Sequence, residues 1–161
     1  MLAVLGVVLP AQQQPPPQQV SQSKPNLTGK WVFNPQKSSL KTSAPTSMTM
    51  EIEQSDPEIR FARVQVYGDQ TFKWNLKADA DSQKEVVQHT PQYTANVRVF
   101  WEGSSLVLDQ QIIAPDGTQA DDVVTYSLVD GGKLLQGVER QTVVGGKGTL
   151  TNTWLYDRQP Q

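Results

Sequence analysis

Cysteine is absent from the 161 residues, and histidine occurs once, at His89. Without cysteine the chain can form no disulfide, thiol nucleophile, zinc finger or iron–sulfur cluster. A single histidine excludes a metal site built from several imidazoles and argues against a histidine-based catalytic array. The sequence also lacks a Gly-x-Ser-x-Gly nucleophile elbow. We therefore expect no metal, no cofactor and no enzyme activity, and we expect His89 to be an exposed loop residue.

Neither sign of charge dominates, since 14 Lys and Arg stand against 16 Asp and Glu and the formal net charge is −2. Nucleic-acid-binding domains carry a basic patch that neutralises phosphates, so nucleic acid is not an expected partner. Long apolar runs are missing as well. The apolar run at residues 2–9 has the sequence LAVLGVVL, which is too short for a membrane-spanning helix of about 20 residues. No transmembrane segment is expected.

Residues 2–9, followed by the small residue Ala11, have the length and composition of the apolar region of a secretory signal peptide. Residues 1–11 are therefore predicted to be a signal peptide that lacks its basic start, and the protein is predicted to be secreted or periplasmic. An apolar N-terminus without a targeting role is the alternative. Residues 12–25 (QQQPPPQQVSQSKP) contain almost no apolar side chains and are predicted to be a disordered linker.

From residue 47 onward, apolar and polar residues alternate with a period of two, which is typical of half-buried antiparallel strands. Glycines recur every 14 residues in turn sequences, at 103, 117, 131 and 145, and this spacing suits hairpins between neighbouring strands. The candidate strands are 29–34, 47–54, 58–67, 70–78, 85–90, 94–102, 105–113, 120–129, 133–142 and 148–157.

These segments predict an all-β fold: a single antiparallel up-and-down meander of about 8–10 strands. Closing the meander into a barrel removes the two unpaired edges of such a sheet. The segment 58–67 breaks the alternation, because Ile59 and Phe61 occupy odd positions whereas Val64 and Val66 occupy even ones. A β-bulge near residues 62–63 would reconcile the two halves and is predicted there.

The first candidate strand opens with the sequence LTGKW at residues 27–31. A Gly-x-Trp at this place, followed by a meander, resembles the calycin group, which comprises lipocalins, fatty-acid-binding proteins and avidins. The region 26–159, which opens with LTGKWVFNPQKS and closes with WLYDRQ, also resembles small secreted lipocalin-like proteins of bacteria. The resemblance implies a lipocalin-like barrel in which Trp31 plugs one end and Arg158 packs across its face. The link 35–46 is short and holds two prolines, so the helical lid of fatty-acid-binding proteins is not expected. The positions that bind biotin in avidins cannot be matched one by one in this sequence, so biotin binding is a minor alternative.

The alternation also selects the residues that would face the barrel interior and bind a ligand there. These are Phe72, Trp74, Val99, Trp101, Leu108, Tyr126, Arg140, Trp154 and Tyr156. Gln110, Gln136 and Asn152 are predicted on the same face. Arg140 shares parity with Leu134 and Val138, so it would either bind a ligand carboxylate or reach water at the barrel rim.

Two functions remain open at this point. The first is binding of a small hydrophobic or amphipathic molecule inside the barrel of a monomeric protein, for which an interior cavity is required. The alternative is a solid-core barrel that acts as a structural or interaction module at the cell envelope, without a small ligand. An enzyme would need Arg140 to meet Tyr126 or Tyr156 in the interior, and ranks third.

Overall fold

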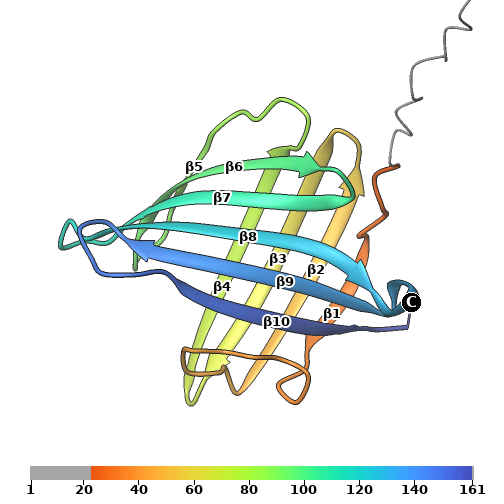
Figure 1. Ribbon diagram of the computed structural model, residues 1–161, viewed down its shortest axis with the longest axis horizontal. Coiled ribbons are helices and arrows are strands. Elements are labelled where there is room, and N and C mark those ends of the chain that lie inside the picture. Colours follow the sequence, from red (N-terminus) through yellow and green to blue (C-terminus); the bar gives the residue numbers. More distant parts are fainter. Residues whose placement is uncertain (1–22, 161) are drawn as a thin grey trace, which may run out of the picture.

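The computed structural model describes residues 23–160 and consists almost entirely of antiparallel strands (Figure 1). The strands are β1 (Gly29–Phe33), β2 (Ser47–Ser55), β3 (Glu58–Tyr67), β4 (Gln70–Asp79), β5 (Val86–His89), β6 (Thr94–Glu102), β7 (Ser105–Ile113), β8 (Gln119–Val129), β9 (Leu134–Val143) and β10 (Leu150–Arg158). One 3₁₀ turn, η1 (Asp130–Gly132), joins β8 to β9. The all-β meander is confirmed. The predicted signal peptide and most of the predicted linker lie outside the described residues.

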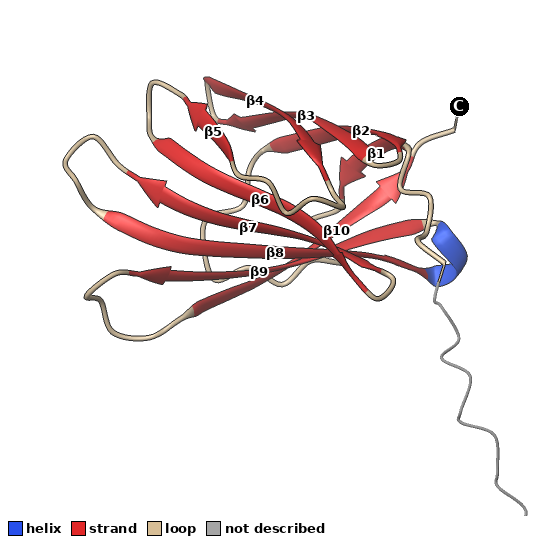
Figure 2. Cartoon of the chain, turned by 90° about the horizontal axis from the view of Figure 1, so that it is seen from above, coloured by secondary structure: helices blue, strands red, loops and turns tan. Residues whose placement is uncertain are grey.

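Each strand pairs with its neighbours in the sequence, and the sheet order is β4-β3-β2-β1-β10-β9-β8-β7-β6-β5. The pairing of β1 with β10 turns the meander into a barrel. The two edge strands of the sheet, β4 and β5, lie side by side in this barrel (Figure 2). No backbone ladder joins β4 to β5 within the described residues, and the Gln88 side chain instead donates a hydrogen bond to the Asn75 carbonyl at 2.5 Å. The barrel is therefore nearly closed, with one seam.

The glycine spacing found in the sequence corresponds to turns that need glycine. Gly103, Gly117, Gly131 and Gly145 have φ angles of 61°, 85°, 62° and 77°. This left-handed region is readily available only to residues without a Cβ atom. Each of the four glycines lies in the connection that follows β6, β7, β8 or β9.

The bulge predicted in β3 is wrong. β2 and β3 pair residue for residue from Ser47 opposite Val66 to Ser55 opposite Glu58, without an inserted residue. Alternation along β3 is therefore unbroken, and Arg63 and Gln65 face the same interior as Ile59 and Phe61. The hydrophobic pattern of residues 58–67 changes phase because the inward side chains of β3 change from apolar to polar halfway along the strand.

One end of the barrel is filled by a hydrophobic core around Trp31, which is fully buried. The contact expected between Trp31 and Arg158 is present, with the guanidinium carbon 4.4 Å from the indole centroid. The Trp31 indole N–H donates to the Leu27 carbonyl at 3.1 Å, and Arg158 donates to the Thr28 carbonyl at 3.3 Å. Residues 27–28 thus seal this end together with β1 and β10. No helix within residues 23–160 is long and apolar enough to cross a bilayer.

Candidate ligand-binding site

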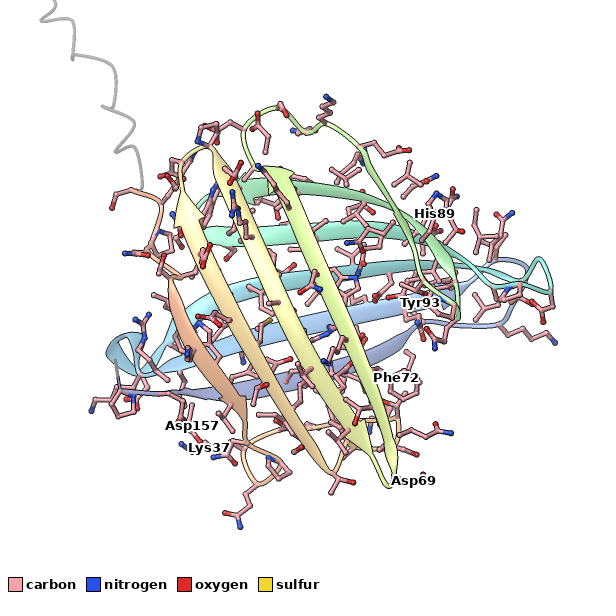
Figure 3. The ribbon with its side chains drawn as sticks, turned by 180° about the vertical axis from the view of Figure 1, so that it is seen from behind. Lys37, Asp69, Phe72, His89, Tyr93 and Asp157 are labelled. Carbon is pink, nitrogen blue, oxygen red and sulfur yellow. The ribbon has the colours of Figure 1, made fainter. Side chains whose placement is uncertain are left out.

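The opposite end of the barrel is hollow and encloses a cavity of about 490 Å³. Its mouth lies between the β1–β2 link at Thr42, the start of β4 at Phe72 and the β5–β6 turn at Tyr93. Phe72 and Tyr93 lie on the same side of the molecule in Figure 3. Small-molecule pockets in proteins commonly measure about 300–1,000 Å³, so this cavity can hold a compact ligand.

Four of the predicted wall residues line this cavity: Phe72, Trp74, Tyr126 and Trp154. The polar residues Gln110 and Asn152, which were predicted on the same face, also line it. Val99, Leu108 and Tyr156 are instead buried in the hydrophobic core, and Trp101 packs against that core. The inward orientation predicted for these four residues is right, but they do not border the cavity.

Arg140 does not face the interior, so its predicted place in the ligand site is wrong. It is exposed on β9, where Leu135, Gly137 and Glu139 point inward and Gln136 and Arg140 point outward. The pairing expected for an enzyme, Arg140 with Tyr126 or Tyr156, is therefore absent.

Two features of β9 explain the error. Leu134 and Leu135 are adjacent, so hydrophobicity alone does not fix the phase of the strand. Gly137 has no side chain to mark the inward face. A Cβ atom at Gly137 would lie only 3.0 Å from Cε1 of Tyr126, which shows that the tyrosine ring occupies the space that a larger residue would need.

Arg63 on β3, which the sequence analysis missed, is a cation in the cavity wall. Its guanidinium carbon lies 4.8 Å from the centroid of the Trp74 ring. Its Nε is buried without a hydrogen-bond partner, and no carboxylate among residues 23–160 lies within ion-pair distance of it. An unbroken alternation through 58–67 would have placed Arg63 inward, but the bulge was assumed instead.

Glu139, the second missed residue, accepts two hydrogen bonds from the protein through one carboxylate oxygen. Its Oε2 accepts hydrogen bonds from the Trp154 indole N–H at 2.9 Å and from the Asn152 amide at 2.6 Å. The Asn152 carbonyl oxygen in turn accepts from the backbone N–H of Lys41 at 2.7 Å. This chain fixes the Trp154 ring in the cavity wall and attaches the β1–β2 link to the mouth.

Asp122 on β8 also lines the cavity, and only 5% of it is exposed. Gln110 on β7 donates to its Oδ2 at 3.1 Å, whereas its Oδ1 has no partner. Burial and the nearby Glu139 carboxylate raise the pKa of Asp122 to about 7, although Arg63 acts in the opposite direction. As expected from alternation, the adjacent Asp121 points outward and is exposed.

Several solved structures share this architecture. Lipid binding protein 8 of Caenorhabditis elegans superposes with a TM-score of 0.57 at 15% identity, over 82% of this chain and 94% of its own. A secretory abundant heat soluble protein from Ramazzottius varieornatus gives 0.59 at 10%, over 86% and 99%. The wild-type fluorescent protein UnaG gives 0.55 at 16%, over 83% and 97%. The fold is a calycin-type barrel. No family model matches the sequence, and neither does any curated protein.

The calycin-type barrel thus presents a mixed wall of aromatic rings and polar groups, with two cations, Arg63 and the exposed Lys73, and two acidic side chains. No group of three or more His, Cys, Asp or Glu side chains that could hold a metal ion occurs in residues 23–160. His89, at the end of β5, is exposed and does not line the cavity. The arrangement is suited to holding a small molecule that combines an apolar body with polar groups.

Proposed function

We propose that this protein binds a small amphipathic molecule in the cavity, with an anionic group of the ligand next to Arg63. The observation that carries the proposal is a permanently charged side chain, enclosed by the cavity wall and without a carboxylate partner. Arginine does not lose its proton in proteins, and a buried charge is costly unless it is paired. A ligand carboxylate, sulfonate or phosphate would supply the missing charge-assisted hydrogen bonds.

The apolar body of the ligand would contact Phe72, Trp74 and Trp154. A solid-core structural module has no need of such a cavity, so the hollow half of the barrel favours ligand binding over that alternative. The name of lipid binding protein 8, a protein with the same fold, supports the same choice.

The proposed location of this activity is outside the cytoplasm, in a secreted or periplasmic protein that acts as a monomer without a cofactor. Support comes from the apolar segment 2–9 and the small residue Ala11 that follows it. Mass spectrometry of the protein purified from its native host would test the location. A mature chain that begins near residue 12 is expected, and an intact chain found in the cytoplasm would contradict it.

The test of binding uses two fluorescent dyes of similar size, the anionic 8-anilinonaphthalene-1-sulfonate (ANS) and the neutral N-phenyl-1-naphthylamine. Both are expected to bind the wild-type protein at micromolar concentrations. Arg63→Gln should weaken ANS binding by about 10- to 100-fold, the value of a lost charged hydrogen bond, and change the neutral dye by no more than about twofold. Arg60→Gln is the matched control, because Arg60 lies on the same strand but is exposed and points outward.

The outcomes separate the possibilities clearly. If neither dye binds at micromolar concentration, the ligand-binding function is refuted and a structural or interaction role without a small ligand takes its place. If both dyes bind and Arg63→Gln weakens them equally, the cavity binds ligands but Arg63 does not hold the anionic group. Far-UV circular dichroism of each variant verifies that the barrel is still folded.

A further inference from the structure

We propose that Asp122 and Gln110 form a second polar contact point in the cavity, and that the ligand is an amphiphilic acid carrying a hydroxyl group on its apolar body. The inference rests on the proposed function, because it requires the cavity to hold the ligand. Arg63 would bind the acidic group, and the Asp122–Gln110 pair would bind the hydroxyl.

The two residues face each other on neighbouring strands, since Gln110 of β7 is the register partner of Asp122 of β8. Both line the cavity, and only 8% of Gln110 and 5% of Asp122 is exposed. The single hydrogen bond between them uses Oδ2 of Asp122 and leaves Oδ1 without a partner. Buried polar atoms are nearly always hydrogen-bonded, so an unpaired carboxyl oxygen at a cavity wall indicates a missing partner.

Of the two acidic side chains that line the cavity, Asp122 is the one with a buried oxygen that has no partner among the described residues. The Glu139 carboxylate lines the same cavity, but the indole of Trp154 and the amide of Asn152 both donate to it. Glu139 therefore has a structural explanation within the protein. Asp122 receives one hydrogen bond, from Gln110, and no other residue in the described part of the chain is bonded to its side chain.

The chemistry of the missing partner follows from the charges around Asp122. Because its pKa is raised to about 7, the carboxyl is partly protonated and partly ionised near neutral pH. A hydroxyl can both donate and accept a hydrogen bond, so it matches either form. A second carboxylate on the ligand would be repelled by Glu139 and by ionised Asp122, whereas a hydroxyl carries no charge.

The rest of the wall agrees with a ligand that is more polar than a plain alkyl chain. The cavity wall contains the side chains of Gln65, Gln110 and Gln141 and the phenols of Tyr67, Tyr93 and Tyr126, together with apolar side chains such as Ile112 and Val124. An unsubstituted chain would cover these polar groups without replacing the hydrogen bonds they make to water, which lowers affinity.

The experiment measures displacement of ANS by stearate and by hydroxystearates with the hydroxyl at the second, tenth or twelfth carbon. At least one hydroxystearate is expected to bind the wild-type protein about two- to tenfold more tightly than stearate, the value of one net hydrogen bond. Asp122→Leu should abolish this preference, whereas Asp122→Asn, which retains hydrogen bonding, should keep it. Asp121→Leu, on the outer face of the same strand, is the matched control and should change nothing.

Gln110→Leu is a second, independent variant. It removes the N–H that holds Oδ2 of Asp122, so the hydroxyl preference should also fall. If neither ANS nor stearate binds the wild-type protein, the proposed function itself fails. If stearate binds but no hydroxystearate is preferred, or the preference survives in both Asp122→Leu and Gln110→Leu, the second contact point is refuted while the binding function stands.

Discussion

At the scale of single residues, Arg63 and Asp122 determine how the cavity responds to charge. They project into it from β3 and β8, which belong to the two crossing layers of the barrel (Figure 1). Asp122 is buried and Arg63 is half-buried, and removal from water disfavours an unpaired charge. Arg63 cannot respond by losing its proton, but Asp122 can respond by gaining one, and its pKa of about 7 reflects this. The charge of the cavity therefore changes near neutral pH through Asp122.

The first prediction concerns the stability of the ligand-free protein. The pKa of Asp122 is about 7 when folded, against a reference value of 3.8. Between these two pH values an unfolded chain loses the proton and the folded protein keeps it, so the free energy of unfolding falls as the pH rises and levels off above about 7. The effect is at most about 4 kcal/mol. Urea denaturation at pH 4 to 8 should show that Asp122→Asn lacks this decline.

The comparison must be made as a difference between variant and wild type. Half-buried carboxyls with lowered pKa, such as Asp79 and Asp157, act in the opposite direction, because their contribution to stability is lost as the pH falls. The advantage of Asp122→Asn over wild type should grow from pH 4 to pH 7, whereas Asp121→Asn should follow the wild-type curve. Parallel curves for wild type and Asp122→Asn would show that Asp122 ionises normally in the folded protein.

At the scale of strands, alternation predicted the fold well because most strands have one apolar and one polar face. It failed where a strand borders the cavity instead of the core. In β3 the inward positions 63 and 65 are polar, so the sequence of this regular strand had the pattern of a strand with a β-bulge. In β9 the inward position 137 is glycine, so Arg140 was assigned to the wrong face. Hydrophobic alternation predicts which side chains are buried in a core. It does not predict which polar side chains face a cavity, because that depends on how distant strands are arranged.

The second prediction tests the packing of β9 against β8. The methyl carbon introduced by Gly137→Ala would lie only 3.0 Å from Cε1 of Tyr126. Tyr126 cannot easily retreat, because its ring also packs 5.9 Å from the Phe61 centroid. The substitution should lower the free energy of unfolding by about 1–3 kcal/mol, as overpacking usually does.

Chemical denaturation of a double-mutant cycle would assign this cost to the tyrosine ring. In a Tyr126→Leu background the smaller side chain leaves room, so Gly137→Ala should cost clearly less than it does in the wild-type protein. Gln136→Ala, on the outer face of the same strand, serves as the control for changes in β9. An equal cost of Gly137→Ala in both backgrounds would mean that strand propensity, and not contact with Tyr126, is responsible.

The third prediction concerns the sealed end, where β1 and β10 meet. Trp31→Ala removes a fully buried indole together with its hydrogen bond to Leu27 and its contact with Arg158. The expected loss is about 3–5 kcal/mol in the free energy of unfolding, measured by chemical denaturation. Arg158→Lys keeps the charge but loses the planar stacking group, so it should cost less, about 0.5–2 kcal/mol. A loss below about 1 kcal/mol for Trp31→Ala would show that this end of the barrel is not a stability centre.

At the scale of the whole molecule, the barrel is divided into a filled half and a hollow half, and its wall has one seam. The filled half contains Trp31 and the aromatic core, and the hollow half contains the cavity. The seam lies between β4, which pairs only with β3, and β5, which pairs with β6 over just four residues. This seam and the cavity mouth share Lys73, Trp74 and Thr90. The least tightly bonded part of the sheet therefore borders the entrance.

The last prediction follows from this division and is measured by hydrogen–deuterium exchange. Amides of β5 and the seam-facing amides of β4 should exchange fastest among the strands, because one backbone edge of each has no partner strand. The central strands β8 and β9, which pair on both sides along their length, should exchange slowest. Saturation with ANS should then slow exchange at residues 90–93 and at the start of β4, which border the mouth, and leave the sealed end around Trp31 unchanged. Protection confined to the sealed end would place the ligand elsewhere, and uniform exchange would show that the seam does not weaken the barrel.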